Sequence, residues 1–244
     1  MASTIEHTSW DALQALRVRI ETSVAAAPNL VAAAQLFADQ LREAFSTVVL
    51  SRVFAVAPMR TLPAPEQAAA QQLAITVGRP GAVEPATPVL SLLGTAGREA
   101  TWNNRTTSVG HRAIPLIDAG FVDGAPMVAS LLSSLAVDLA QLRGDASVQL
   151  RSLPGGLNAR FYVPDARETR DAAGRHIIAA RDFVTKYDIR TVFGMGGIYV
   201  NGLMVVAIVF TNELLPPAAI DRFPAFIAAF KVATSPLAVA NSIY

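Results

Sequence analysis

The sequence predicts an α+β fold in which helices pack on a central antiparallel sheet of about five or six strands. Apolar residues at helical spacing alternate along the chain with short runs rich in β-branched residues. The pair Asn201-Gly202 separates two such runs, and this pair is the strongest short signal for a hairpin, which joins antiparallel strands. The 244 residues fit one large domain or one domain with an appendage, since domains average roughly 150 residues.

Two helices are expected at the start of the chain. Ser9 is a suitable N-cap for a helix over residues 9–25, and Asn29 for a second helix over residues 30–45. The first helix carries an apolar stripe formed by Leu13, Leu16, Ile20 and Val24. We predict that residues 1–27 form an N-terminal helical extension and that residues 28–244 form the domain itself.

The middle of the chain predicts strands with helices between them. A β-rich run over residues 48–56 ends at Pro58, and Pro65 precedes an expected helix. Pro126 starts another strong helical pattern. The expected helices cover 66–77 and 127–142, the expected short strands cover 89–93 and 114–117, and the segment 94–112 is polar with no clear period.

The last third of the chain predicts the hairpin between two helices. Residues 147–163 are expected to be extended, with a turn at 154–156. The charge-rich segment 165–175 is expected to be a solvated loop and the exposed start of a helix that ends near Tyr187. The hairpin strands should cover 191–199 and 203–211. A final helix should begin near Asp221 and stop at Pro236.

Composition and charge exclude several classes of protein. Hydrophobic residues make up 52% of the chain and charged residues 16%, which excludes a disordered chain. The net charge of +1 lacks the basic surplus of a nucleic-acid binder. The absence of cysteine excludes disulfides and thiolate sites. No signal peptide is visible, and the uncharged run 192–210 contains a turn, so we predict a cytoplasmic protein without a membrane or nucleic-acid partner.

Catalytic and metal-binding patterns are scarce. The chain has no phosphate-binding P-loop motif and no G-x-S-x-G or H-E-x-x-H motif. The run Gly194-Met195-Gly196-Gly197 precedes a strand rather than a helix, which indicates close packing or a bulge rather than a dinucleotide loop. His7, His111 and His176 are too far apart for a local metal motif. We predict a protein that is not an enzyme, an enzyme of unrecognised type being the weakest alternative.

The candidate ligand-binding residues lie in the polar segment 102–111 and on the predicted strand near residue 161. Asparagine donates and accepts hydrogen bonds, arginine binds anions, and tryptophan stacks on rings. Arg160 and Tyr162 alternate on a predicted strand, on the face opposite to Phe161. The candidates are Trp102, Asn103, Asn104, Arg105, His111, Arg160 and Tyr162. The competing interpretations are a polar loop that satisfies its own turns, a structural histidine, and solvent-facing side chains on the strand.

Three stretches carry a resemblance to a known family. They read "LVAAAQLFADQLREAFSTVVLSRVFAV", "RDFVTKYDIRTVFGMGGIYVNGLMVVAIVFTNE" and "DRFPAFIAAFKVA". Their order of helix, strand, hairpin and closing helix resembles the GAF family of small-molecule sensor domains over about residues 28–235, and a PAS-like sensor fits nearly as well. The resemblance implies a sheet of about six antiparallel strands with a ligand pocket on one face, and terminal helices that pair in a dimer.

The chain also departs from the family. It lacks the cysteines that bilin-binding members and free methionine sulfoxide reductases use, and it lacks the N-K-F-D-E set of cyclic-nucleotide-binding members. Met195 stands where the family often has proline. The resemblance therefore leaves the pocket unassigned.

The sequence therefore predicts a non-enzymatic sensory or regulatory domain. A small molecule would bind between the sheet and the 100–112 loop, and the domain would signal through a homodimer of its terminal helices. The cofactor is open: haem would take His111 as its axial ligand, and an organic anion would take Arg105 as its anchor. The alternative is a ligand-free interaction module in which the stripe from Leu13 to Val24 pairs with its own copy or with a partner helix. Whether the chain is a piece of a longer protein is also open.

Overall fold

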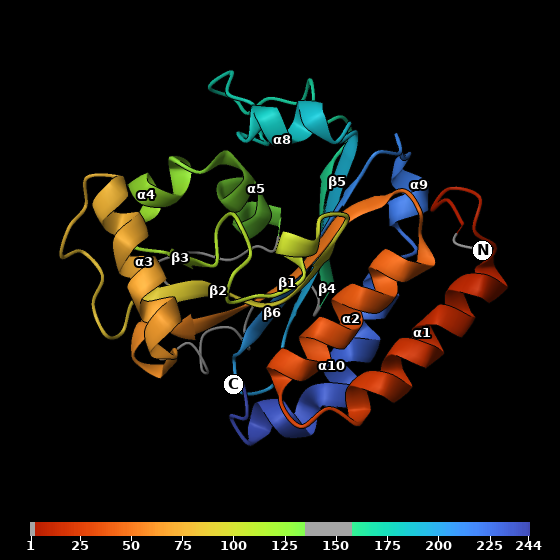
Figure 1. The fold of residues 1–244 in the computed structure, drawn as a ribbon, viewed down its shortest axis with the longest axis horizontal. Coiled ribbons are helices and arrows are strands. Elements are labelled where there is room, and N and C mark those ends of the chain that lie inside the picture. Colours follow the sequence, from red (N-terminus) through yellow and green to blue (C-terminus); the bar gives the residue numbers. More distant parts are fainter. Residues whose placement is uncertain (1–2, 135–157) are drawn as a thin grey trace.

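A computed structural model describes residues 3–134 and 158–244 of the chain (Figure 1). Its helices are α1 (Trp10–Ala25), α2 (Leu30–Ala44), η1 (Met59–Thr61), α3 (Ala64–Thr76), η2 (Ala100–Trp102), α4 (Ala119–Asp123), α5 (Pro126–Ser134), α8 (Arg181–Lys186), α9 (Pro217–Ile220) and α10 (Pro224–Val239). Its strands are β1 (Val48–Pro58), β2 (Pro88–Gly97), β3 (Ala113–Pro115), β4 (Asn158–Val163), β5 (Thr191–Ile198) and β6 (Met204–Thr211).

The described strands form one six-stranded sheet in the order β3-β2-β1-β6-β5-β4, and each strand runs antiparallel to its neighbours. This confirms the predicted fold class. β5 and β6 are the predicted hairpin, and Asn201-Gly202 lies in the loop that joins them. Of these two residues, only Gly202 adopts the left-handed conformation, with φ 86°. Asn201 instead bonds through its side chain to the Leu203 N–H and the Ala238 carbonyl, so the expectation of positive φ at both positions was wrong.

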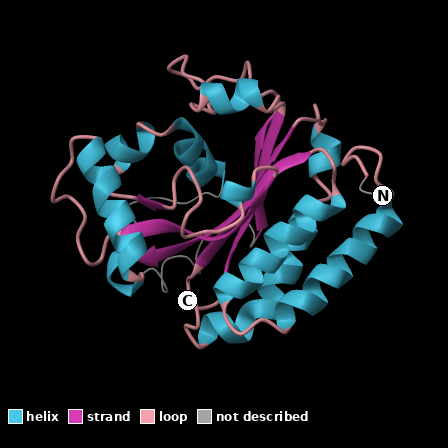
Figure 2. Ribbon diagram, in the orientation of Figure 1, coloured by secondary structure: helices cyan, strands magenta, loops and turns pink. Residues whose placement is uncertain are grey.

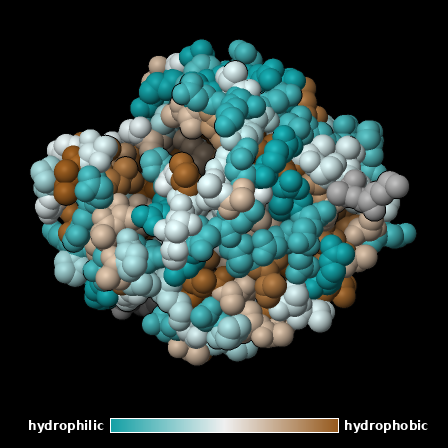
Figure 3. Space-filling view, viewed as in Figure 1, coloured by the Kyte–Doolittle hydropathy of each residue, from teal (hydrophilic) through white to brown (hydrophobic). Residues whose placement is uncertain are grey.

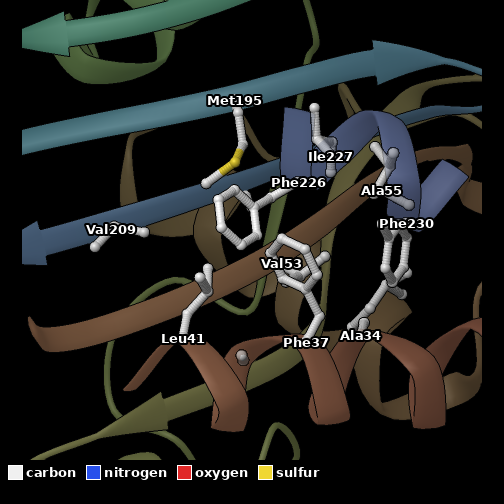
Figure 4. Packing of buried hydrophobic residues seen from close by; sticks show 14 of the residues in the cluster. Ala34, Phe37, Leu41, Val53, Ala55, Met195, Val209, Phe226, Ile227 and Phe230 are labelled. Atoms are coloured by element: carbon white, nitrogen blue, oxygen red, sulfur yellow. The ribbon is translucent and has the colours of Figure 1, made fainter. Parts of the chain in front are cut away.

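The first face of the sheet is covered by α2 and α10, and α1 packs on these two helices from the outside (Figure 2). Ser9 and Asn29 cap α1 and α2 as predicted, each accepting a bond from a backbone N–H. Phe37 of α2 meets Phe230 of α10 edge to face, and both rings are fully buried over β1 (Figure 4). The long helices therefore lie on the first face of the sheet, and shorter elements cover the opposite face.

The stripe of α1 belongs to this same core. Leu13, Leu16, Ile20 and Val24 are each 5% exposed or less and lie in one cluster with residues of α2 and α10. In this structure the stripe is therefore covered by the chain's own helices. The interaction-module hypothesis had instead assigned the stripe to a copy of the chain or to a partner helix.

The second face of the sheet is covered by α4, α5, α8 and the connection 98–112, which carries η2 (Figure 1). Apolar side chains of the strands, including Leu50, Phe54 and Ile208, meet buried residues of these elements. Helix α3 lies beside β3, the edge strand of the sheet. Figure 3 shows this side of the molecule hollowed between the α5 region and connection 98–112.

Two helix ends differ from the prediction. The helix expected to start within the charge-rich segment covers only Arg181–Lys186, because residues before it form turns in which Asp171 binds the Arg175 side chain and backbone. His176 lies in those turns rather than at a helix start. Pro236 lies inside α10 and does not end it. The helix ends instead before Asn241, whose left-handed φ of 55° is typical of a helix terminus.

Other boundaries agree in type and differ in extent. β2 continues to Gly97, beyond the expected strand 89–93, because residues up to Gly97 pair with β1. The expected helix 127–142 is described as α5 up to Ser134, and the rest of it, with the turn at 154–156, lies outside the described residues. Within residues 3–134 and 158–244, no helix is long and apolar enough to cross a membrane. The run 192–210 forms β5, its turn and β6.

Candidate functional site

The polar feature of the second face is Arg52, in the middle of β1. Arg52 pairs across the sheet with Ile208 of β6, which belongs to the core of the second face, and with Thr95 of β2. Side chains of directly paired residues lie on the same face of a sheet. The side chains of Arg52 and Thr95 therefore leave the sheet on the second face, on which Leu50 and Phe54 also lie.

Arg52 is buried without an acidic partner. Only 9% of the residue is exposed, and burial lowers its pKa to about 10, so the side chain is still a cation at neutral pH. Its Nη2 donates to the Ser108 hydroxyl at 2.9 Å and to the Val109 carbonyl at 2.6 Å. None of the ion pairs formed by residues 3–134 and 158–244 includes Arg52. Within the part of the chain that the structure describes, its Nε and the Oγ1 of the fully buried Thr95 have no hydrogen-bond partner.

A groove of about 480 Å³ runs beside this cation, between one face of α3 and residues 110–113. Gly110 lines the groove, and a Cβ at this position would lie 3.1 Å from Nη1 of Arg52. Its φ of 102° is a conformation that favours glycine. Gly110 thus allows the backbone to lie directly against the guanidinium. We name this groove, which Gly110 separates from the Arg52 guanidinium, the Arg52 groove.

His111 is the predicted site residue that lies in the Arg52 groove. Its side chain is exposed at the groove, and the surrounding protein together with the nearby Arg52 charge lowers its pKa below the usual value. The imidazole is therefore mostly neutral at pH 7, which is the form that ligates metals and haem.

The residues predicted from 102 to 104 are used inside the fold. Trp102 is 8% exposed, and its ring packs against Phe183 and Tyr187 at centroid distances of 5.7 and 4.8 Å. Asn103 accepts a bond from the Gly97 N–H at 2.6 Å. Asn104 accepts from the Thr106 N–H at 2.9 Å and from its hydroxyl at 2.7 Å, as in a polar loop that satisfies its own turns.

Arg105 links three distant segments of the chain. Its guanidinium pairs with Glu66 of α3, a residue that is 5% exposed. It also lies over the ring of Tyr244, 5.4 Å from the centroid, and the Tyr244 hydroxyl bonds to Ser91 of β2 at 2.9 Å. Arg105 therefore has an internal acid and an internal ring as partners, whereas Arg52 has no acid partner among the described residues.

Arg160 and Tyr162 share one face of β4, opposite to Phe161, as predicted. That face is the first face, because their partners on β5 are Met195 and Phe193, which lie in the core under α10. Arg160 pairs with Asp221, and the Tyr162 hydroxyl donates to the Leu215 carbonyl at 2.6 Å. The structure therefore places both residues on the other side of the sheet from Trp102 and His111.

Comparison with known proteins gives a clear result at the level of structure only. No family model matches the sequence, and no curated protein matches it. Among solved structures, the free methionine-R-sulfoxide reductase of Neisseria meningitidis matches with a TM-score of 0.52 and 14% identity, over 98% of this chain and 99% of that one. The GAF domain of an Acinetobacter phosphoenolpyruvate-protein phosphotransferase matches with a TM-score of 0.51 and 12% identity, over 97% and 98%.

A third solved structure, the phycocyanobilin-bound GAF domain of a cyanobacterial phytochrome, matches with a TM-score of 0.51 and 9% identity, over 93% of this chain and 96% of that one. This chain has a GAF-like fold. The resemblance predicted from the order of elements is thereby confirmed, and it extends over nearly the whole chain. At such low identity the GAF-like fold does not carry a ligand or an activity with it, so these are argued below from this chain's own residues.

Sequence reasoning missed Arg52, the buried cation that lies behind Gly110 of the groove wall. The signal was present as one arginine inside the apolar run from Val48 to Val56. A lone cation in a buried strand needs either a partner or a function. The glycine run of β5 has a simpler explanation. β5 pairs regularly with both neighbours, and Gly194 lies against Phe161, where a Cβ would be 3.4 Å from that residue's Cβ.

Residues 3–134 and 158–244 contain no group of three or more His, Asp or Glu side chains able to hold a metal ion. A haem could use only a lone histidine here, and His111 is the one that faces a groove.

Proposed function

We propose that this chain is a non-enzymatic sensory or regulatory domain that binds a small molecule in the Arg52 groove. The observation that carries the proposal is Arg52, a buried cation without an acid partner in the described part of the chain, placed behind a glycine that lines an open groove. Two of the similar solved structures hold small molecules, phycocyanobilin in one and a substrate in the other, which supports ligand binding on a fold of this kind.

The connection 98–112 offers a route from the groove to the terminal helices. It borders the groove through residues 110–112 and reaches Tyr244 through Arg105. Just before Tyr244, the carbonyls of Ser242 and Ile243 accept bonds from the first N–H groups of α2, at 3.0 Å each. A ligand that shifts the connection would therefore change the packing of α2 and α10, which is the differential contact that regulation requires.

The binding of a small molecule is tested on the freshly purified protein. We expect native mass spectrometry to show a bound small molecule that is released, chemically unchanged, under denaturing conditions. We also expect the released compound, added back, to raise Tm, because a ligand that binds only the folded state stabilises it. Conversion of the compound into a product by the protein would contradict a non-enzymatic function. A Soret band that disappears in His111→Ala would instead establish the haem-binding alternative.

A homodimer through the terminal helices would have to use their outer surface, because the inner stripe of α1 is buried. Between α1 and α10 lies a shallow groove of about 420 Å³, lined by Gln14 and Ala225 among others, and Val232 beside it is 71% exposed. We expect Val232→Glu to convert a dimer to a monomer in sedimentation velocity, since the charge would be buried at the interface. The matched control is Ile75→Glu on α3, where the side chain is 54% exposed. A wild-type chain that is monomeric at micromolar concentration would reject the dimer.

A further inference from the structure

We infer that the ligand of the Arg52 groove is a short peptide that binds in extended form along the edge of the sheet. Its main chain pairs with the main chain of His111 and Ala113, and its carboxylate binds Arg112. This inference rests on the proposed function, because it names the chemical class of the molecule that the same groove takes.

The first observation concerns the outer side of β3, the edge strand of the described sheet, which lies beside α3 (Figure 1). On the inner side of this edge, the Leu92 N–H donates to the Arg112 carbonyl at 2.8 Å. The Leu116 N–H donates to the Pro88 carbonyl at the same distance. Bonded and non-bonded positions alternate in an antiparallel pair. Ala113 comes directly after the bonded Arg112, so its N–H and carbonyl point away from β2.

These outward backbone groups have no partner within residues 3–134 and 158–244. No hydrogen bond outside the pairing of β3 with β2 uses the backbone N–H or carbonyl of His111 or of Ala113. Ala113 is 2% exposed, and buried backbone groups are nearly always paired with protein, water or a ligand. Both residues line the groove, so a molecule bound there lies beside the groups that need a partner.

An extended peptide offers donors and acceptors at the spacing that this edge requires. His111 lies two residues before Ala113, and about three residues of an extended chain span both positions. A peptide that adds to a sheet edge gains its affinity from main-chain hydrogen bonds of this kind. The groove of about 480 Å³ also lies within the usual range of ligand sites, roughly 300–1,000 Å³. A short peptide therefore fits both the spacing and the volume.

The carboxylate is assigned from the charge of the groove. Arg112 lines the groove and donates to the Thr106 carbonyl, and none of the ion pairs formed by the described residues includes it. No aspartate or glutamate is among the described residues that line the groove. Along α3 the wall includes the apolar residues Ala68, Ala69 and Leu73. A peptide with small apolar side chains and a free carboxylate complements this lining, since a carboxylate forms charge-assisted bonds with a guanidinium.

The test compares three tripeptides that share one set of side chains. The parent is acetyl-Ala-Val-Ala with a free C-terminal carboxylate, the second ends in a neutral amide, and the third is methylated on its backbone nitrogens. Each is titrated into the ¹⁵N-labelled full chain and followed by NMR. We expect the parent to shift the backbone signals of His111 and Ala113 and the side-chain signal of Arg112 saturably. The neutral amide should bind about 10-fold more weakly, and the methylated peptide about 5-fold or more, because each loses bonds to the groove.

Two variants test the carboxylate contact from the side of the protein. Arg112→Gln should lower the affinity for the parent about 10-fold and leave the affinity for the neutral amide unchanged, because only the parent carries the charge that Arg112 binds. The matched control is Arg160→Gln, which removes an arginine from the opposite face of the sheet and should leave both affinities unchanged.

Strand addition is overturned if the methylated peptide binds as tightly as the parent, or if no peptide shifts the signals of His111 and Ala113. The carboxylate contact is overturned if Arg112→Gln binds the parent as tightly as the wild type does. If no peptide binds, but a compound without peptide bonds is released from the purified protein and shifts the His111 signal when added back, the proposed function stands and the peptide class fails. If no peptide shifts any signal of the groove and no small molecule is released, the proposed function fails as well.

Discussion

Gly94→Ala is expected to destabilise the protein by about 3 kcal/mol, the upper end of the usual cost of overpacking, because α2 would no longer fit against β2. Gly94 faces the helix layer, and a Cβ on it would lie 2.3 Å from the carbonyl carbon of Ala34 and 2.5 Å from the backbone nitrogen of Gln35. These are backbone atoms in the middle of α2, so the clash is relieved only by moving the whole helix. The same movement would break the two bonds that the Gln35 amide makes with the Thr95 backbone, at 2.8 and 3.1 Å.

The measurement is urea unfolding followed by circular dichroism, with Gly120→Ala as the matched control. Gly120 lies in α4, where a Cβ would meet only Asp118 Oδ1 at an ordinary 3.4 Å. Its free energy of unfolding should stay within about 1 kcal/mol of the wild type, since alanine is the better helix former. Equal stability of Gly94→Ala and Gly120→Ala would show that α2 does not sit against β2 in solution.

The elements that the sequence predicted well are those whose signals are local. Ser9 and Asn29 were recognised as caps because a cap bonds to a backbone N–H a few residues away. The hairpin strands were recognised from their β-branched runs on either side of Asn201-Gly202. Pro236 misled the prediction because a proline removes only one helix bond, and the conformation of Asn241, five residues later, is what ends α10.

The candidate site was harder to predict, because residue type alone does not show which side chains the fold has already used. Arg105 finds its acid 39 positions away and Arg160 finds its acid 61 positions away, and neither pairing has a local signature. Arg52 was not predicted as a site residue, because the face of the sheet on which it lies depends on how β1 pairs with β2 and β6. Its value as a binding group depends on its having no acid partner among the residues that the structure describes, which is visible only in the folded chain.

The placement of Arg105 gives the second large expected effect. Arg105→Ala is expected to lower the free energy of unfolding by about 3–5 kcal/mol, the usual cost of removing one partner from a buried ion pair. Glu66, which is 5% exposed, would lose the cation that pairs with its charge, and its Oε2 already has no hydrogen-bond partner among the described residues. The Tyr244 ring would also lose the cation above it. Thermal and urea unfolding measure the loss, which corresponds to a Tm lower by about 10 °C in a domain of this size.

Two further variants separate this structural role from ligand binding. The double variant Arg105→Ala with Glu66→Ala should recover part of the lost stability, because the unpaired carboxylate is removed as well. Arg160→Ala breaks an ion pair whose side chains are 40% and 56% exposed, and it should cost less than about 1 kcal/mol. An Arg105→Ala protein that unfolds like the wild type but no longer binds the small molecule would show the opposite. Arg105, and not Arg52, would then be the anchor of the ligand. The charge of Glu66 would then be stabilised by groups other than Arg105.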